Sequence, residues 1–248
     1  MQNGPETRVA LEVKDRVAYV TINRPEAKNA LTKSMYAAIR DACAAADADA
    51  EVDILVIQGS SGAFATGGDL KEILAILESD EPTKILDYEE FLPFEAVRSV
   101  RKPTVAHIDG LCIGGGLTLA LMCDILIASD RSRFAIPEAK VGLVDGHLPR
   151  LLREAVPPAK LRYWMYTGVL FPASEAYETG LLSRIVPADQ LQAALDKCLG
   201  ELKASSPEAI KALKRILNET RHLSPMTDAN IALLQPAALQ RLRQFGKR

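Results

Sequence analysis

Two glycine-containing stretches decide how this chain is interpreted. The later one reads Gly110-Leu111-Cys112-Ile113-Gly114-Gly115-Gly116-Leu117, and an earlier one reads Phe64-Ala65-Thr66-Gly67-Gly68-Asp69-Leu70. Each leads from a predicted strand, through glycine, into a predicted helix. Glycine has no Cβ and lets the backbone approach a ligand closely, and the first amides of a helix lack partners and carry partial positive charge. Two such amides aimed at one point would stabilise an oxyanion, which predicts an enzyme that activates a carbonyl group.

The amides of Gly68 and Gly115 are the two candidate donors. A thioester carbonyl gains negative charge on its oxygen when a proton leaves the α-carbon, or when a nucleophile adds to the β-carbon of its enoyl form. Losing one such donor typically raises the barrier by about 3–4 kcal/mol. The alternative for residues 114–116 is a tight strand-to-helix turn without a ligand. The glycines are contiguous, so they do not form a dinucleotide-binding fingerprint.

Glu138 is the candidate acid or base. It follows the predicted strand Arg133–Ile136, and a carboxyl group close to Val141 and Leu143 would be partly desolvated. Desolvation raises the pKa of a carboxyl group toward the range useful for proton transfer. The alternative is a glutamate that only stabilises the N-terminus of a helix.

Asp145 and His147 are polar residues in an otherwise apolar loop, and either could join the site. The alternative for Asp145 is ordinary turn chemistry, because Gly146 follows it. No serine, histidine and carboxylate set lies in a nucleophile-elbow context, so a hydrolase triad is not supported.

Local patterns predict an α/β core followed by a helical C-terminal part. Strands are predicted at 9–13 and 17–22, which form a hairpin, and at 54–57, 103–108, 125–128 and 133–136, with a loop at 62–68 and a turn at 110–116. Helices are predicted at 32–47, with Thr32 as N-cap, and at 70–77, 84–100, 117–122, 148–155, 159–166, 174–179, 191–202, 207–218 and 228–245.

The composition is typical of an ordinary globular enzyme. The chain has 248 residues, enough for one or two domains, and its net charge of −2 argues against a whole-protein field for nucleic acid. The first residues are polar, and no apolar run approaches the roughly 20 residues needed to span a bilayer. Four cysteines without paired short spacing argue against a disulfide framework and a zinc site. We therefore expect a cytoplasmic protein with reduced thiols, no metal, no membrane contact and no nucleic-acid partner.

Together these segments closely resemble the enoyl-CoA hydratase/isomerase family, also called the crotonase superfamily. The likeness runs from Asn23-Arg24-Pro25-Glu26-Ala27-Lys28-Asn29-Ala30-Leu31 to about Pro187. It implies an α/β fold, a crotonase-like spiral of ββα units with a helical C-terminal trimerisation region. Residues 1–190 would form the core with the acyl-CoA site, and residues 191–248 would serve oligomerisation. The implied assembly is a homotrimer or homohexamer.

The resemblance also implies an acyl-CoA thioester as ligand and no separate cofactor, because coenzyme A is part of the substrate. The two glycine amides named above would supply the oxyanion contacts. Ala63 and Ala65 would lie by the adenine and pantetheine part, and Lys28 and Lys71 would contact the phosphates. The alternative for both lysines is simple solvation.

The chain departs from this family at one position that matters for the reaction. Hydratases of the family carry two glutamates; one matches Glu138, and the other should stand where this chain has Thr118. Threonine cannot act as a carboxylate base, whereas one acid suffices to move a proton along a substrate. The loop that brings in Asp145 and His147 is also shorter than in hydratases.

These departures favour isomerisation of an enoyl-CoA double bond, with a single glutamate as acid and base. The first alternative is a hydratase of restricted substrate range, in which Thr118 holds a water and Asp145 replaces the missing acid. Further alternatives are an acyl-CoA hydrolase, a C–C lyase and a catalytically weak CoA-binding protein. RNA binding through Lys211, Lys214, Arg215 and Arg221 is less favoured, because spaced helix cations usually form a solvated face.

Overall fold

The computed structural model describes residues 8–218, 240, 243 and 244, which contain two sheets. The larger sheet has the order β1 (Val9–Lys14), β2 (Val17–Ile22), β3 (Ile54–Gly59), β5 (Thr104–Ile108), β7 (Ile125–Ser129) and β10 (Arg184–Val186). The strands β1 and β2 form the predicted antiparallel hairpin, and the other neighbours pair in parallel.

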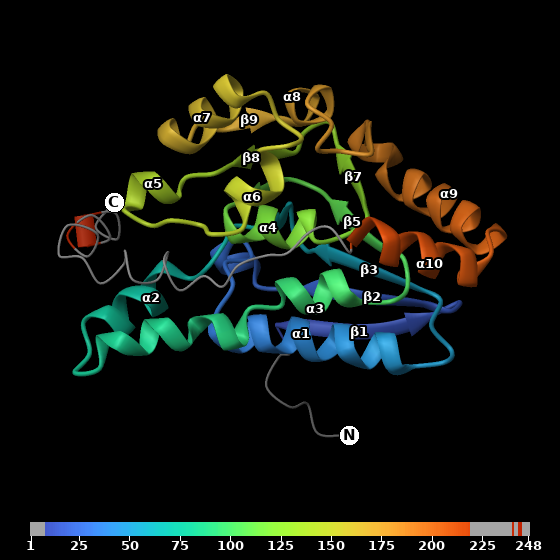
Figure 1. Ribbon diagram of the computed structural model, residues 1–248, viewed down its shortest axis with the longest axis horizontal. Coiled ribbons are helices and arrows are strands. Elements are labelled where there is room, and N and C mark those ends of the chain that lie inside the picture. The colour runs from blue at the N-terminus through green and yellow to red at the C-terminus, as the bar shows by residue number, and fades with distance from the viewer. Residues whose placement is uncertain (1–7, 219–239, 241–242, 245–248) are drawn as a thin grey trace.

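The smaller sheet has the order β4 (Ala63–Ala65), β6 (Leu111–Ile113), β8 (Arg133–Ala135) and β9 (Phe171–Pro172). Three successive strand pairs, β3/β4, β5/β6 and β7/β8, each place their first strand in the larger sheet and their second in the smaller one. A helix follows each pair: α2 (Leu70–Leu77), α4 (Gly115–Leu121) and α5 (Glu138–Val141). This repeat is the predicted spiral of ββα units, and it stacks the ends of β4, β6 and β8 beside one another (Figure 1).

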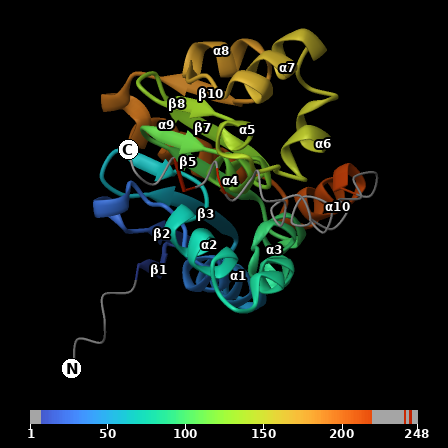
Figure 2. The same ribbon diagram turned by 90° about the vertical axis from the view of Figure 1, so that its left-hand side faces the viewer.

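The other helices enclose this spiral (Figures 1 and 2). At one end lie α1 (Lys33–Ala48), the 3-10 helix η2 (Pro82–Phe91) and α3 (Phe94–Ser99); at the opposite end lie α7 (Pro158–Thr167) and α8 (Ala173–Glu178). The remaining elements are η1 (Pro25–Ala27), α6 (Leu148–Leu152), η3 (Ala188–Gln190), α9 (Leu191–Ala204) and α10 (Pro207–Asn218).

The centre of the larger sheet is buried on both faces, as β3 illustrates, whereas the edge strand β1 is largely exposed. Successive side chains of a strand point to opposite faces. Leu55 and Ile57 belong to the main core, which includes the inner face of α1, whereas Ile54 and Val56 pack with Leu191, Leu195 and Leu199 of α9. The α9 leucines recur every four residues and so form one helical stripe. The division of the chain near residue 190 stays a prediction.

Most predicted elements are confirmed, including the helix at 70–77 and the Thr32 cap, whose Oγ1 accepts from Met35 N at 3.3 Å. Two predictions were wrong at the glycine turns, because the loop at 62–68 contains β4 and the turn at 110–116 contains β6. Both strands have three residues, too few to show an alternating pattern. The strands β9 and β10 and the helix α5 were also missed, because elements of two to four residues are too short to show a periodic pattern.

The predicted helix at 84–100 is also wrong, since it is broken between η2 and α3. Pro93 stands at the break, and a proline disfavours helical geometry in the residue before it. The predicted helix at 228–245 lies largely outside the described residues.

Candidate active site

The Gly68 turn (residues 66–69) and the Gly115 turn (residues 113–116) lie side by side. They follow β4 and β6, which are parallel neighbours in the smaller sheet. A Cβ built on Gly115 would lie 3.8 Å from Gly68 N, and one built on Gly67 would lie 3.3 Å from Gly115 N. Pairing of two short strands therefore brings together turns that are far apart in the sequence.

Hydrogen bonding around the Gly68 turn uses the carbonyl oxygen of Gly67 and the amide of Asp69, the residues on either side of Gly68. Leu31 N donates to Gly67 O at 2.8 Å, and Asp69 N donates to Leu31 O at 2.8 Å. Gly115 is the first residue of α4, where a backbone N–H has no partner within its own helix. Within the described part of the chain, we find no acceptor for the amide of Gly68 or of Gly115.

Asp69 holds the Gly68 turn against the start of α2. Its carboxylate accepts from the amides of Lys71 and Glu72 at 2.9 and 3.3 Å, and Arg24 donates to it at 2.5 Å. Burial opposes the charged form, but the Arg24 guanidinium and the two helix amides outweigh it and lower the pKa of Asp69. A charged cap of this kind fixes the backbone just after Gly68.

Two positions in the Gly115 turn require glycine. Gly114 has φ 54° and ψ −125°, and a Cβ there would lie 2.3 Å from Oε1 of Glu138. A Cβ on Gly116 would lie 2.2 Å from the backbone oxygen of Ala65. The absence of side chains thus lets α4 begin directly against β4 and lets the Glu138 carboxyl group approach the turn.

Glu138 is the first residue of α5, and its side chain turns inward. Oε2 is buried and has no hydrogen-bond partner among the described residues. Burial, and next the negative charge of Asp145, raise the pKa of Glu138 to about 8. A carboxyl group with such a pKa exchanges a proton near neutral pH.

Asp145 and Thr118 are in direct contact. The buried Thr118 donates from Oγ1 to Oδ2 of Asp145 at 2.8 Å. Oδ1 of Asp145 accepts from the amides of His147 and Leu148 at 2.7 and 2.8 Å, so Asp145 also caps the start of α6. Asp145 therefore makes the predicted turn contacts and also lies near Glu138.

The other predicted site residues are more scattered. His147 is buried, and its ring meets Phe94 edge-on with centroids 5.0 Å apart. Ala63 and Ala65 are buried within β4. Lys28 and Lys71 are both exposed near the Gly68 turn: Thr66 Oγ1 donates to Lys28 O at 3.0 Å, and Lys71 is in the first turn of α2.

Tyr36 of α1 is a site residue that the sequence analysis missed. Its Oη lies 2.7 Å from the position that a Cβ on Gly115 would occupy. Helical periodicity places Tyr36 on the buried face of α1, where it is 2% exposed, but periodicity does not reveal which residue it faces. No sequence signal distinguishes it from an ordinary core residue.

A cavity of about 550 Å³ lies elsewhere, between the end of α3 and α10. It contains none of the predicted catalytic or substrate-binding residues, and we place the site at the glycine turns because the reactive groups converge there.

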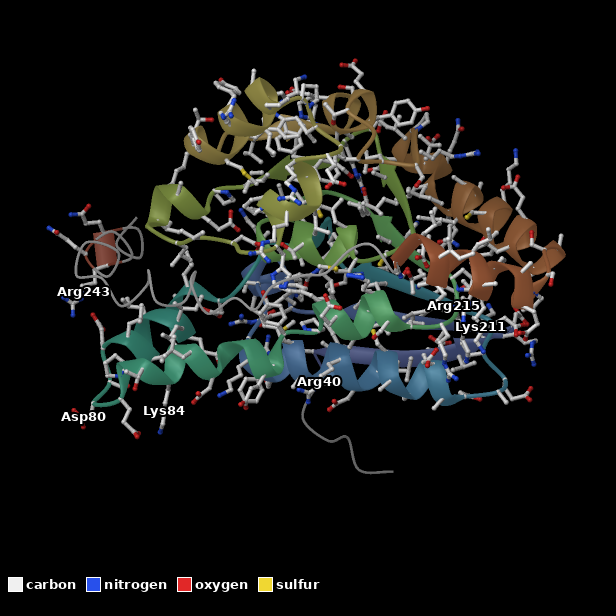
Figure 3. The ribbon with its side chains drawn as sticks, viewed as in Figure 1. Arg40, Asp80, Lys84, Lys211, Arg215 and Arg243 are labelled. Carbon is white, nitrogen blue, oxygen red and sulfur yellow. The ribbon has the colours of Figure 1, made fainter. Side chains whose placement is uncertain are left out.

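Lys214 borders this cavity but is buried, and it pairs with Asp124 at 2.7 Å. The predicted row of helix cations is therefore interrupted, while Lys211 and Arg215 project from α10 at the surface (Figure 3); Arg221 lies outside the described residues.

Two further features of the described residues concern metal binding and membrane insertion. In the described ranges, no group of three or more His, Cys, Asp or Glu side chains is placed to hold a metal ion. None of the helices described combines the length and apolar character that a membrane crossing requires.

The chain is similar to known proteins both in sequence and in fold. Residues 12–235 match a family model described as enoyl-CoA hydratase/isomerase. The chain is 36% identical to a probable enoyl-CoA hydratase of Mycobacterium tuberculosis over 85% of its own length and 80% of that protein. It is 31% identical to a crotonyl-CoA hydratase of Syntrophomonas wolfei over 85% of its length and 81% of that protein. A solved enoyl-CoA hydratase of Mycobacterium avium subsp. paratuberculosis superposes with a TM-score of 0.85 at 27% identity, covering 97% of this chain and 99% of that one.

Proposed function

Because the chain belongs to the enoyl-CoA hydratase/isomerase family and is an acyl-CoA enzyme, we propose that it isomerises the double bond of an enoyl-CoA. Glu138 would act as the single acid and base, and the amides of Gly68 and Gly115 would bind the thioester oxygen. The observation that carries this proposal is the convergence of two partnerless amides and a buried carboxyl group with a pKa of about 8.

The two amides would lower the barrier through electrostatics. When a proton leaves the α-carbon, negative charge moves onto the thioester oxygen. Donors already aimed at that oxygen stabilise the charge without reorganising. The contacts of Leu31 with Gly67 and Asp69 support this role, since they hold the Gly68 turn in place while leaving its central amide unused.

Glu138 would shuttle the proton. In its ionised form it takes a proton from the α-carbon of a 3-enoyl thioester, and the electrons of that C–H bond pass into a dienolate. In its protonated form it returns the proton to the γ-carbon, which leaves a conjugated 2-enoyl thioester and an ionised Glu138. Asp145 is already engaged as an acceptor, because its carboxylate accepts hydrogen bonds from Thr118 and from the amides of His147 and Leu148.

Hydration is the second candidate, and the contact between Thr118 and Asp145 favours it. This contact puts a carboxylate beside the position where hydratases of the family carry their second glutamate. Asp145 and Thr118 would hold the water that adds to the β-carbon, protonated Glu138 would deliver its proton to the α-carbon, and the carboxylate of Asp145 would accept the proton that the water loses. The relatives described above are named as hydratases, which supports the same candidate function.

The decisive experiment uses Glu138→Gln and a panel of short, medium and long enoyl-CoAs, with isomerisation and hydration read separately. We expect wild-type turnover of at least one 3-enoyl-CoA, and loss of that turnover in Glu138→Gln with CoA-thioester binding retained. Unchanged activity in the variant would refute the role of Glu138. Binding without turnover by the wild type would instead indicate a CoA-binding protein, and release of free CoA would indicate a hydrolase.

The remaining parts of the proposal concern ligand and assembly. Lys28 and Lys71 would contact the phosphates of coenzyme A, and Ala63 and Ala65 would lie by its adenine and pantetheine part, with no separate cofactor. A homotrimer or homohexamer is proposed from the family resemblance. The exposed Leu213, Ile216 and Leu217 of α10 support it, because an apolar helix face of this kind is suited to a subunit contact.

A further inference from the structure

We propose that the Tyr36 hydroxyl donates a third hydrogen bond to the thioester oxygen, beside the amides of Gly68 and Gly115. This inference rests on the proposed function and assigns a new group to the same site. It concerns a side chain of α1, which belongs to neither glycine turn.

The first support is the position of the hydroxyl group. A Cβ on Gly115 would lie 2.7 Å from Tyr36 Oη, 3.6 Å from Gly67 Cα and 3.8 Å from Gly68 N, so these groups surround one point. Since the N–Cα and Cα–Cβ bonds are each about 1.5 Å long, Tyr36 Oη lies within about 6 Å of Gly115 N. One oxygen atom between these two groups can accept a hydrogen bond from both.

The second support is the backbone that carries Tyr36. Leu31 exchanges hydrogen bonds of 2.8 Å with the residues on either side of Gly68, and Thr32 caps α1 directly after it. Tyr36 N then donates to Thr32 O at 3.0 Å, in the first turn of the helix. The start of α1 is thus tied to the Gly68 turn, and Tyr36 keeps a set position relative to the Gly68 amide.

The third support is the packing of the ring. Tyr36 is 2% exposed, and Phe94 meets its ring edge-on, with centroids 6.1 Å apart and planes at 79°. A leucine would fill such a core position without a polar atom, whereas the phenol brings an O–H next to Gly115, which has no side chain to exclude it. This neutral donor would bind the ground-state carbonyl and bind the enolate more strongly, while keeping its own proton.

The test is Tyr36→Phe, which keeps the ring and removes only the hydroxyl. For whichever of isomerisation and hydration the wild type catalyses, we expect kcat to fall on the order of 10²-fold, with little change in KM. Tyr163→Phe is the matched control, because Tyr163 is exposed on α7, and it should leave kcat unchanged.

A spectroscopic measurement separates this role from a structural one. A conjugated thioester such as 2,4-hexadienoyl-CoA absorbs at longer wavelength when its carbonyl is polarised. Bound to Glu138→Gln it should show a red shift, and the shift should shrink in Glu138→Gln/Tyr36→Phe. Equal shifts and an equal kcat would overturn the role of Tyr36 alone. A wild type that neither turns over enoyl-CoAs nor polarises the probe would overturn the proposed function, and this inference with it.

Discussion

At the scale of single residues, the site depends on how two carboxyl groups differ. The carboxyl group of Glu138 is buried, and Oε2 has no hydrogen-bond partner in the part of the chain that the structure describes, whereas Asp145 accepts three hydrogen bonds. Burial opposes ionisation of a carboxyl group, and so does a neighbouring negative charge. Burial and the charge of Asp145 both act on Glu138, which therefore holds its proton up to a pKa of about 8. Two carboxyl groups in one site thus acquire different roles from their surroundings.

This difference predicts a pH dependence with a defined sign. If Glu138 is the base that starts isomerisation, kcat/KM rises with pH through the pKa of about 8, because only the ionised form accepts a proton. Asp145→Asn removes a negative charge that raises this pKa, so the rising limb should move to lower pH. Asp80→Asn, at an exposed position, is the control and should leave the profile in place.

A rate that falls with rising pH would support hydration, the second candidate. If Glu138 is the acid that completes hydration, the rate falls with pH through the same range, and Asp145→Asn moves that falling limb to lower pH. A profile that does not respond to Asp145→Asn would contradict the coupling of the two carboxyl groups. The measurement is kcat/KM across pH 5–10 for each reaction.

At the scale of elements, the most important contact is the one between the start of α4 and β4. This helix begins against β4 at Gly116, whose missing side chain leaves room for the backbone oxygen of Ala65. The neighbouring Gly114 has a backbone geometry that favours glycine and lies against Glu138. The same contact that packs α4 against β4 therefore also positions the Gly115 amide.

We expect Gly116→Ala to destabilise the protein. Its Cβ would lie 2.2 Å from backbone, which cannot rotate away, so β4 and α4 must separate at a cost of about 1–3 kcal/mol or more. Thermal unfolding measures this change as a lower Tm. Gly200→Ala in α9 is the control, because nothing lies within 4 Å of its Cβ and the change should stabilise the helix by up to about 1 kcal/mol. Equal Tm values for the two variants would show that the contact between α4 and β4 tolerates a side chain at position 116.

At the scale of the whole molecule, α10 is attached to the core by an ion pair whose lysine is buried. Lys214 contacts Asp124 at 2.7 Å and also donates to Lys102 O at 3.0 Å. Asp124 Oδ2 accepts from the backbone N and the hydroxyl of Thr104, both at 2.8 Å. This network joins α10 to the N-terminal ends of β5 and β7 in the larger sheet, so the helix does not depend on apolar contacts alone.

Lys214→Met should therefore cost stability. Leaving Asp124 without its cation is expected to cost about 3 kcal/mol, the low end for a buried pair because Asp124 keeps some solvent contact. Lys211→Met, one helical turn earlier and exposed, should change stability by no more than about 0.5 kcal/mol. Urea unfolding compares the two. If both variants matched the wild type, the ion pair would not anchor α10.

The sequence by itself determined the strand–glycine–helix turns, the hairpin, the capped helices, Glu138 as the candidate acid and the family. These features are encoded within short stretches, where glycine, proline and helix caps act on their immediate neighbours. Only the tertiary structure decided that Gly68 lies beside Gly115, that Asp145 meets Thr118 next to Glu138, that Tyr36 faces Gly115, and that Lys214 turns inward to Asp124. Periodicity shows that a residue is buried, but its neighbour depends on which strands pair, and the three-residue strands β4 and β6 carry too little pattern to reveal that pairing.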